Sequence, residues 1–167
     1  YQLYEEFCGE LNEVQLNTLN SIINNEEITL KLDKVIDMDK LFTDRDFRDV
    51  NYQVMNVISA FVPNFLGGSA DVVTSTKTYL KGKEDFSSEN YGGKNIAFGV
   101  REHAMGSILN GMALCNLRVF GSCFLAFSDY LKPSIRLSCM MKLPVTYIFT
   151  HDSIWVGKDG ATHEPVE

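Results

Sequence analysis

The second half of the chain alternates short apolar runs with amphipathic runs, and this alternation limits the folds open to it. The predicted elements are a strand over 95–100, a helix over 102–116, a strand over 118–125, a helix over 128–141 and a strand over 144–150. The strands are apolar almost throughout, which is typical of strands buried on both faces. The sequence therefore predicts an α/β fold, a twisted parallel sheet with helices on both faces.

The part of the chain before this alternation differs in composition and in hydrophobic pattern. Residues 1–44 are polar and acidic, and the leucines and isoleucines between positions 11 and 23 predict one helix in an otherwise irregular lead-in. A helix over 50–62 ends at Pro63 and leads into a short strand at 65–66, and 72–93 suit a long loop. We expect a lead-in over 1–44 and a domain over 45–167 that is truncated at its C-terminal end.

Composition excludes several classes of protein. A chain of 167 residues that is 45% hydrophobic can form one ordinary core. A net charge of −7 argues against a nucleic-acid partner. No apolar run approaches the roughly 20 residues that span a bilayer, so we expect no membrane contact and a cytoplasmic location. Because the chain begins at Tyr1 and not at methionine, we expect it to be a piece of a longer polypeptide.

Every candidate functional segment follows the end of a predicted strand. Residues 67–71 follow the first strand, Glu102 the second, 124–130 the third and 151–153 the last. In parallel sheets ligands bind beyond the carboxyl ends of the strands, so we expect these segments to meet at one edge. The pattern predicts a ligand site there without naming the ligand.

Each of these segments also has a plainer interpretation. Glu102 suits the positive N-terminus of a helix, and Asp71 suits a turn. Aromatic residues three apart, such as Phe124 and Phe127, are usually core residues. A metal site at His151 and a second histidine 12 residues on is disfavoured, because the spacing fits no structural zinc pattern. Gly106 and Gly111 weaken the helix after Glu102, so we expect close approach of another group to the backbone there.

Four segments in order resemble the pyrimidine-binding domain of transketolases, which depend on thiamine diphosphate. They are 67–71 (GGSAD), 99–106 (GVREHAMG), 124–130 (FLAFSDY) and 149–153 (FTHDS), the last followed by 156–167 (VGKDGATHEPVE). The resemblance implies transfer of a two-carbon ketol unit from a ketose phosphate to an aldose phosphate, in the pentose phosphate pathway. It also implies that this piece alone is inactive.

The resemblance implies a cofactor site around Glu102. In the family this glutamate is catalytic, hydrogen-bonding N1′ of the aminopyrimidine so that the thiazolium loses a proton and becomes nucleophilic. Burial favours a protonated carboxyl and a helix N-terminus opposes it, and we expect burial to dominate. Phe124, Phe127 and Tyr130 would pack against the aminopyrimidine, and Asp71 would contribute to the same site. The family places the diphosphate and a divalent metal, Mg or Ca, on the preceding domain, and a homodimer completes each active site.

The resemblance also implies a sugar phosphate site. Arg48 and Ser75 match positions that bind the phosphate, for which a guanidinium fork and a hydroxyl are suited. His151 would contact the phosphate end, Asp159 a sugar hydroxyl, and His163 would hold substrate near the thiazolium as a second catalytic residue.

This chain departs from the family at several positions. Trp155 stands where a small side chain is usual, Lys158 where glutamate is usual, Ala161 where proline is usual, and 72–75 read VVTS in place of LAPS. These departures leave sugar preference open. A related thiamine-dependent synthase, of the dihydroxyacetone or deoxyxylulose phosphate type, and a non-catalytic domain that keeps the fold remain alternatives.

Overall fold

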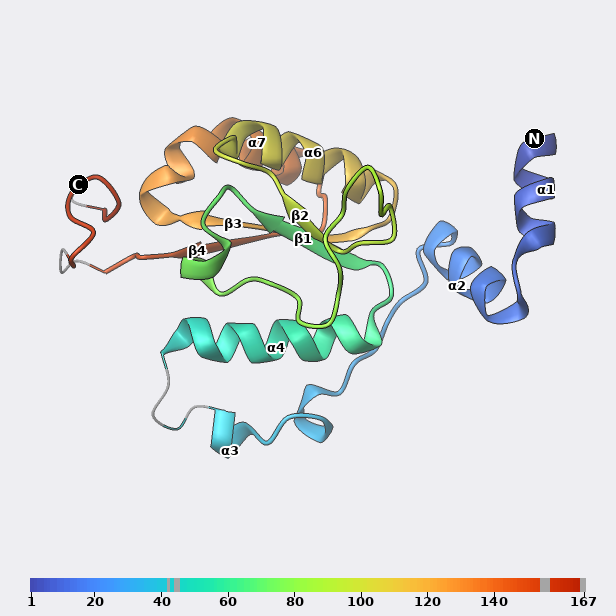
Figure 1. The fold of residues 1–167 in the computed structure, drawn as a ribbon, viewed down its shortest axis with the longest axis horizontal. Helices are drawn as coiled ribbons and strands as arrows, with labels where there is room; N and C mark the ends of the chain where they lie inside the picture. The colour runs from blue at the N-terminus through green and yellow to red at the C-terminus, as the bar shows by residue number, and fades with distance from the viewer. Residues whose placement is uncertain (42, 44–45, 154–156, 166–167) are drawn as a thin grey trace.

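The computed structural model describes residues 1–41, 43, 46–153 and 157–165. Its centre is a parallel sheet of four strands in the order β2-β1-β3-β4 (Figure 1). The strands are β1 (Phe65–Ser69), β2 (Asn95–Ala97), β3 (Arg118–Phe124) and β4 (Val145–Thr150). The predicted α/β fold with a parallel sheet is confirmed.

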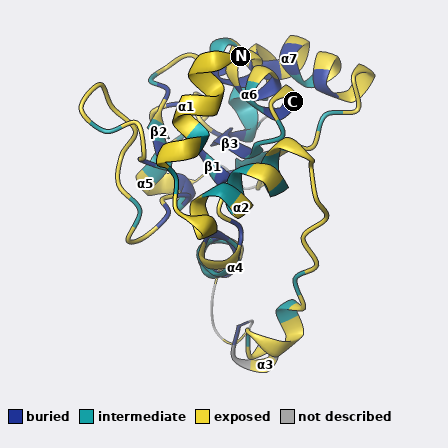
Figure 2. Ribbon diagram, turned by 90° about the vertical axis from the view of Figure 1, so that its right-hand side faces the viewer, coloured by how far each residue is buried: buried dark blue, intermediate teal, exposed yellow. Residues whose placement is uncertain are grey.

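Helices cover both faces of this sheet. The helix α4 (Phe47–Phe61) lies on one face, while α6 (Glu102–Leu114) and α7 (Ser128–Met140) lie side by side on the other (Figure 1). Alternate residues of β3 point to opposite faces, so Val119 packs in the core under α6 and α7, and Phe120 packs in the core under α4. The buried residues gather along the sheet and along the inner sides of these helices (Figure 2).

The contact between α6 and α7 depends on one glycine. A Cβ atom at Gly106 would lie 2.6 Å from Leu131 Cδ1 and 2.6 Å from Ser134 Cβ, so the predicted close approach is confirmed there. The same prediction is wrong for Gly111, because no described atom outside its own helix would lie within 4 Å of its Cβ.

The lead-in extends away from the sheet (Figure 1). It contains α1 (Gln2–Glu10), which the sequence did not predict, then α2 (Glu13–Ile23), a 3-10 turn (Leu32–Lys34) and α3 (Met38–Leu41). No residue of α1 or α2 is buried. The expected boundary between 44 and 45 falls on residues outside the described part of the chain.

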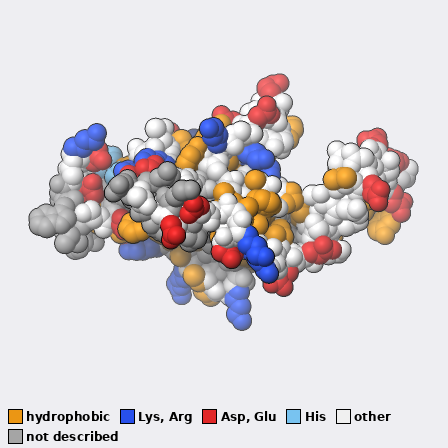
Figure 3. All heavy atoms as spheres, turned by 90° about the horizontal axis from the view of Figure 1, so that it is seen from below, with side chains coloured by type: hydrophobic (Ala, Val, Ile, Leu, Met, Phe, Trp, Pro, Cys, Tyr) orange, Lys and Arg blue, Asp and Glu red, His pale blue; other side chains and the backbone are white. Residues whose placement is uncertain are grey.

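A small apolar groove of about 360 Å³ lies between the lead-in and the body of the domain. Ile28 and Leu30 contribute to it from the lead-in, and Ile58, Val62 and Phe65 from the body. Hydrophobic side chains gather on this side of the molecule near the point where the lead-in departs (Figure 3). In the described residues no helix has the length and apolar character needed to cross a bilayer.

Candidate functional site

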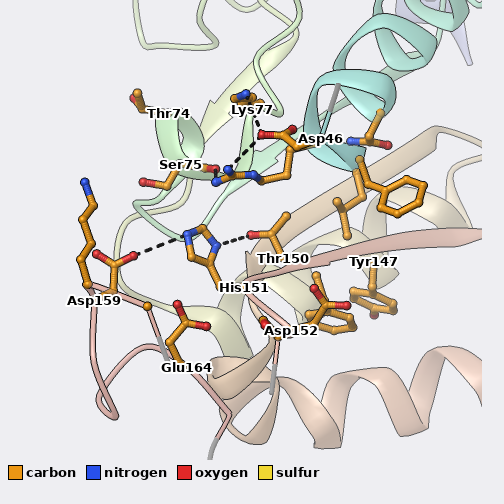
Figure 4. A pocket seen from close by; sticks show the side chains of 18 of the residues that line it. Asp46, Thr74, Ser75, Lys77, Tyr147, Thr150, His151, Asp152, Asp159 and Glu164 are labelled. Atoms are coloured by element: carbon orange, nitrogen blue, oxygen red, sulfur yellow. Dashed lines mark hydrogen bonds and ion pairs between the residues drawn. The ribbon is translucent and has the colours of Figure 1, made fainter. Parts of the chain in front are cut away.

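The carboxyl ends of the strands carry an open cavity of about 1100 Å³. Strands β3 and β4 end together, with Phe124 opposite Thr150, and the cavity is lined by β4 and by residues 151–153 after it. Four residues that the sequence predicted for the substrate all line it: Arg48, Ser75, His151 and Asp159 (Figure 4). Helix α4 supplies the first, and a short helix, α5 (Val73–Thr76), supplies the second.

One side of the cavity is a charged wall whose lining residues are Asp46, Arg48, Ser75 and Lys77, with Asp49 paired to Lys77. Asp46 begins α4 as its N-cap, and its side chain accepts a hydrogen bond of 2.9 Å from the Asp49 backbone N–H. Arg48 Nη2 lies 3.1 Å from Asp46 Oδ2, and Arg48 Nη1 donates to the Ser75 carbonyl at 3.2 Å. Lys77 Nζ lies 2.6 Å from Asp49 Oδ1 and 3.4 Å from Asp46 Oδ2. The wall is therefore a network and not a set of single charges.

The network shifts the pKa values of Asp46 and Lys77. The pKa of Asp46 is lowered, first by the hydrogen bond from the Asp49 backbone and then by Arg48 and Lys77. The pKa of Lys77 is raised, chiefly by its hydrogen bond to Asp49. Both groups stay charged near neutral pH, and the cationic side chains remain partly exposed beside the cavity, where they can meet an anion.

Helix α5, which carries Ser75, is anchored from behind by three buried hydroxyl groups. The Oγ1 atoms of Thr76 and Thr78 are 2.9 Å apart, and they lie 3.2 Å and 2.7 Å from Ser122 Oγ on β3. All three residues are almost fully buried. The hydroxyl cluster fixes the backbone of α5 against the sheet, and so fixes the Ser75 carbonyl that Arg48 contacts.

His151 joins the cavity to an aromatic wall formed by Phe124, Phe127, His151 and His163. The Phe124 and Phe127 rings stack with centroids 5.7 Å apart and an interplanar angle of 14°. The His151 ring lies 3.8 Å from Phe124, and His163 meets Phe124 and Phe127 edge-on at 5.8 Å and 5.5 Å. Among the described residues no ring contact joins Tyr130 to this wall, and its side chain is 65% exposed.

His151 links the aromatic wall to Asp159, on the far side of its ring. Its backbone is left-handed, with φ of 57°, which turns the chain sharply as it leaves β4. Its Nδ1 lies 2.9 Å from Thr150 Oγ1, and its Nε2 lies 3.7 Å from Asp159 Oδ2. The ring is thus held by two polar neighbours and by Phe124, with its edge toward the cavity (Figure 4).

Glu102 is the first residue of α6 and is 8% exposed. Within the described residues its carboxyl group has no hydrogen-bonded partner, although it sits at a helix N-terminus. Burial, and then the charge of Glu102, raise the pKa of Cys123 to about 12, so the carboxyl lies near the end of β3. Cys123 immediately precedes Phe124, which places a buried acid close to the start of the aromatic wall.

Asp71 lies in a second cavity of about 390 Å³ at the ends of β1 and β2. Its backbone is also left-handed, with φ of 64°. The preceding Gly68 is needed for strand pairing, because a Cβ there would lie 1.7 Å from the Ile96 carbonyl oxygen. Ser75 lines this cavity as well as the larger one.

Among the charged residues that line the large cavity, sequence reasoning did not single out Asp46, Lys77 and Glu164. The spacing of Asp46 and Asp49 before an apolar helix was an available capping signal. Lys158 also lines the cavity, whereas Trp155 falls outside the described residues. In the described part of the chain no three His, Cys, Asp or Glu side chains are grouped to hold a metal ion.

These features define a class: an α/β domain with a cavity at the carboxyl edge of a parallel sheet, lined by a charged wall and adjoined by an aromatic wall. The sequence profile described as transketolase, pyrimidine binding domain, matches residues 44–167. The chain belongs to this family of transketolase pyrimidine-binding domains.

Similar proteins agree with this assignment. The transketolase of Bacillus subtilis strain 168 is 60% identical over 116 residues, covering 69% of this chain and 17% of that protein. The transketolase of Physarum polycephalum is 45% identical over 152 residues, covering 89% of this chain and 23% of that protein. The crystal structure of Pichia stipitis transketolase in complex with sedoheptulose 7-phosphate matches with a TM-score of 0.83 at 34% identity, covering 99% of this chain and 26% of that one. The chain thus spans about a sixth to a quarter of the length of these relatives.

Proposed function

We propose that the whole protein is a transketolase that transfers a two-carbon ketol unit from a ketose phosphate to an aldose phosphate. The observation that carries the proposal is the meeting of Arg48, Ser75, His151 and Asp159 around one cavity beside an aromatic wall. Structures of Pichia stipitis transketolase with sedoheptulose 7-phosphate and with xylulose 5-phosphate, similar to this chain, support a sugar phosphate as the ligand.

The residues present suit thiamine diphosphate as the cofactor. When bound, this group supplies a carbon nucleophile that can break and form bonds next to a carbonyl. Glu102, buried and without a hydrogen-bond partner among the described residues, would exchange a proton with a ring nitrogen of the aminopyrimidine. Phe124, Phe127 and Tyr130 would offer flat apolar surface to that ring, worth about 0.5 to 1.5 kcal/mol per well-placed pair. Asp71 would complete the site from the neighbouring cavity.

The two walls would divide the recognition of substrate. Arg48, Ser75 and His151 would hold the phosphate, because a guanidinium fork and hydroxyl and imidazole donors match its oxygens. Asp159 would accept a hydrogen bond from a sugar hydroxyl. His163, which stands edge-on to both phenylalanines, would hold the reacting end of the substrate beside the cofactor ring.

Other parts of the working enzyme lie outside this chain. We propose that a preceding domain holds the diphosphate with Mg or Ca, and that a homodimer completes each active site. The proposal includes a cytoplasmic location and a role in the pentose phosphate pathway. This chain alone would then show no turnover.

The test uses the full-length protein with xylulose 5-phosphate and ribose 5-phosphate. The Glu102→Gln variant should still bind thiamine diphosphate, measured by titration, while ketol transfer falls by orders of magnitude. Unchanged activity in that variant would remove the role given to Glu102. Preference for pyruvate or formaldehyde over ribose 5-phosphate would instead indicate a related thiamine-dependent synthase, and no turnover with any of them would indicate a non-catalytic domain.

A further inference from the structure

The Glu164 carboxyl group is a buried acid that the proposed site has not used. It lines the large cavity and is only 6% exposed. Its Oε2 atom is buried and has no hydrogen-bond partner among the residues that the structure describes. Leaving a buried polar atom unpaired is costly, more so for a charged group, so a native carboxyl in this position calls for a donor from outside the described residues, such as a bound ligand.

The backbone fixes this carboxyl in place. Residues 157–164 form a tight turn in which Gly160 N–H donates to Gly157 O, and the N–H groups of His163 and Glu164 both donate to Gly160 O, each at 3.2 Å. A Cβ at position 157 would lie 3.2 Å from Glu164 Oε1, so the side chain packs directly against the glycine backbone. Its position is therefore set by packing, which leaves Oε2 buried and without a hydrogen-bond partner among the described residues.

The surroundings of Glu164 indicate what kind of donor would suit it. Ser75 and Lys77 lie on one side of the His151 ring and Glu164 on the other, with Asp159 at the end of the ring (Figure 4). The imidazole of His151 already faces Asp159 at 3.7 Å. The cations of the charged wall and of Lys158 thus line the same cavity as the carboxylates of Asp159 and Glu164, which fits a ligand with an anionic head and a hydroxyl-bearing chain. A metal ion would need more ligands than this, and no group of three is present in the described residues.

We propose that Glu164 is a further specificity-determining residue, whose Oε2 accepts a hydrogen bond from a hydroxyl of the sugar chain between the ketol unit and the phosphate. This rests on the proposed function and adds a second carboxylate to Asp159 on the hydroxyl side of the substrate. Discrimination follows because a substrate without that hydroxyl leaves the buried carboxyl unpaired again.

The experiment compares two ketol donors in the full-length protein: xylulose 5-phosphate, which has the hydroxylated chain, and hydroxypyruvate, which lacks it. Glu164→Met keeps the length of the side chain but removes the acceptors, and it should lower kcat/KM for xylulose 5-phosphate by about 10- to 100-fold. The loss for hydroxypyruvate should be less than threefold. Glu164→Gln, which retains one acceptor, should fall between the wild type and the Met variant.

Glu10→Gln is the matched control, because Glu10 is exposed in α1 at the far end of the lead-in. Thermal unfolding of each variant identifies any loss of fold, and the conservative Gln variant carries the test if the Met variant does not fold. Equal losses for both donors, or no loss for either, would overturn the role of Glu164 and leave the proposed function standing. Absence of transfer by the wild type from either donor would overturn both.

Discussion

The charged wall of the large cavity and the aromatic wall beside it are held in place by different forces. Phe124, at the centre of the aromatic wall, is 4% exposed and ends a strand that is buried almost throughout. The charged wall is held by ion pairs whose side chains are 33% to 44% exposed. The comparison teaches that the aromatic surface is part of the core of the domain, whereas the charged surface can change with little effect on the fold.

The largest effect should come from the aromatic wall. Phe124→Ala should lower the free energy of unfolding by about 3 to 5 kcal/mol, because it removes a large buried ring and leaves a cavity. Urea denaturation of this chain measures it. Phe86→Ala is the control, since Phe86 is 44% exposed and contacts only one described ring, that of Tyr91. A similar loss of unfolding free energy in the two variants would mean that the aromatic wall is not part of the core, and would contradict the difference between the walls.

A smaller effect should come from the hydroxyl cluster behind the charged wall. Thr78→Val keeps the shape of the side chain but leaves Thr76 and Ser122 short of a buried partner, at a cost of about 1 to 3 kcal/mol. Thr74→Val, at an exposed position of the same helix, should be close to neutral. If Thr78→Val is neutral too, α5 and the Ser75 carbonyl are held by something other than these hydroxyls.

Asp46 contributes to the charged wall in two ways, through its N-cap hydrogen bond and through its charge, and two substitutions separate them. Asp46→Ala should cost about 1 kcal/mol through loss of the N-cap, while Asp46→Asn keeps the cap and should cost less. Because the pKa of Asp46 is lowered on folding, its charge stabilises the folded state above the ordinary value of 3.8. That part of the stability is lost as pH falls through the lowered pKa. Unfolding curves from pH 7 to pH 2 should therefore converge for the wild type and Asp46→Asn at the acid end, and parallel curves would contradict the assignment.

The smallest effect should come from Lys77→Met. The side chain and its partners are partly exposed, and ion pairs of this kind add little to stability and are screened by salt. We expect a loss below that of Asp46→Ala, shrinking further between 0.05 and 1 M NaCl. A loss that salt does not reduce would mean that Lys77 acts through packing of its stem.

The sheet was predictable because strands buried on both faces are apolar almost throughout. Such apolar runs can be recognised in the sequence alone, without knowledge of distant contacts. Helix α1, a helix of nine residues that buries none of them, was not predicted. Helix α5 lay inside an expected loop, because four residues rich in Thr and Ser give no helical period and the buried hydroxyls that hold them come from distant positions.

The same limits apply to the site. Strand ends place Glu102, Phe124 and His151 at one edge without any knowledge of side chains. The burial of Glu164 depends on how a glycine-containing turn folds back on itself, and no local pattern in the sequence indicates that. Lys77 has a left-handed backbone at the end of α5 and reaches across to α4, a contact between residues 28 positions apart.

Helix α5 lies between two cavities and contributes residues to both. Thr74 and Ser75 border the large cavity on one side and the smaller Asp71 cavity on the other. A single insertion or deletion in this one-turn helix would change the shape of both cavities. A change in the length of α5 therefore cannot enlarge or narrow one cavity alone. Any adjustment of one chamber alone must be made at its outer rim.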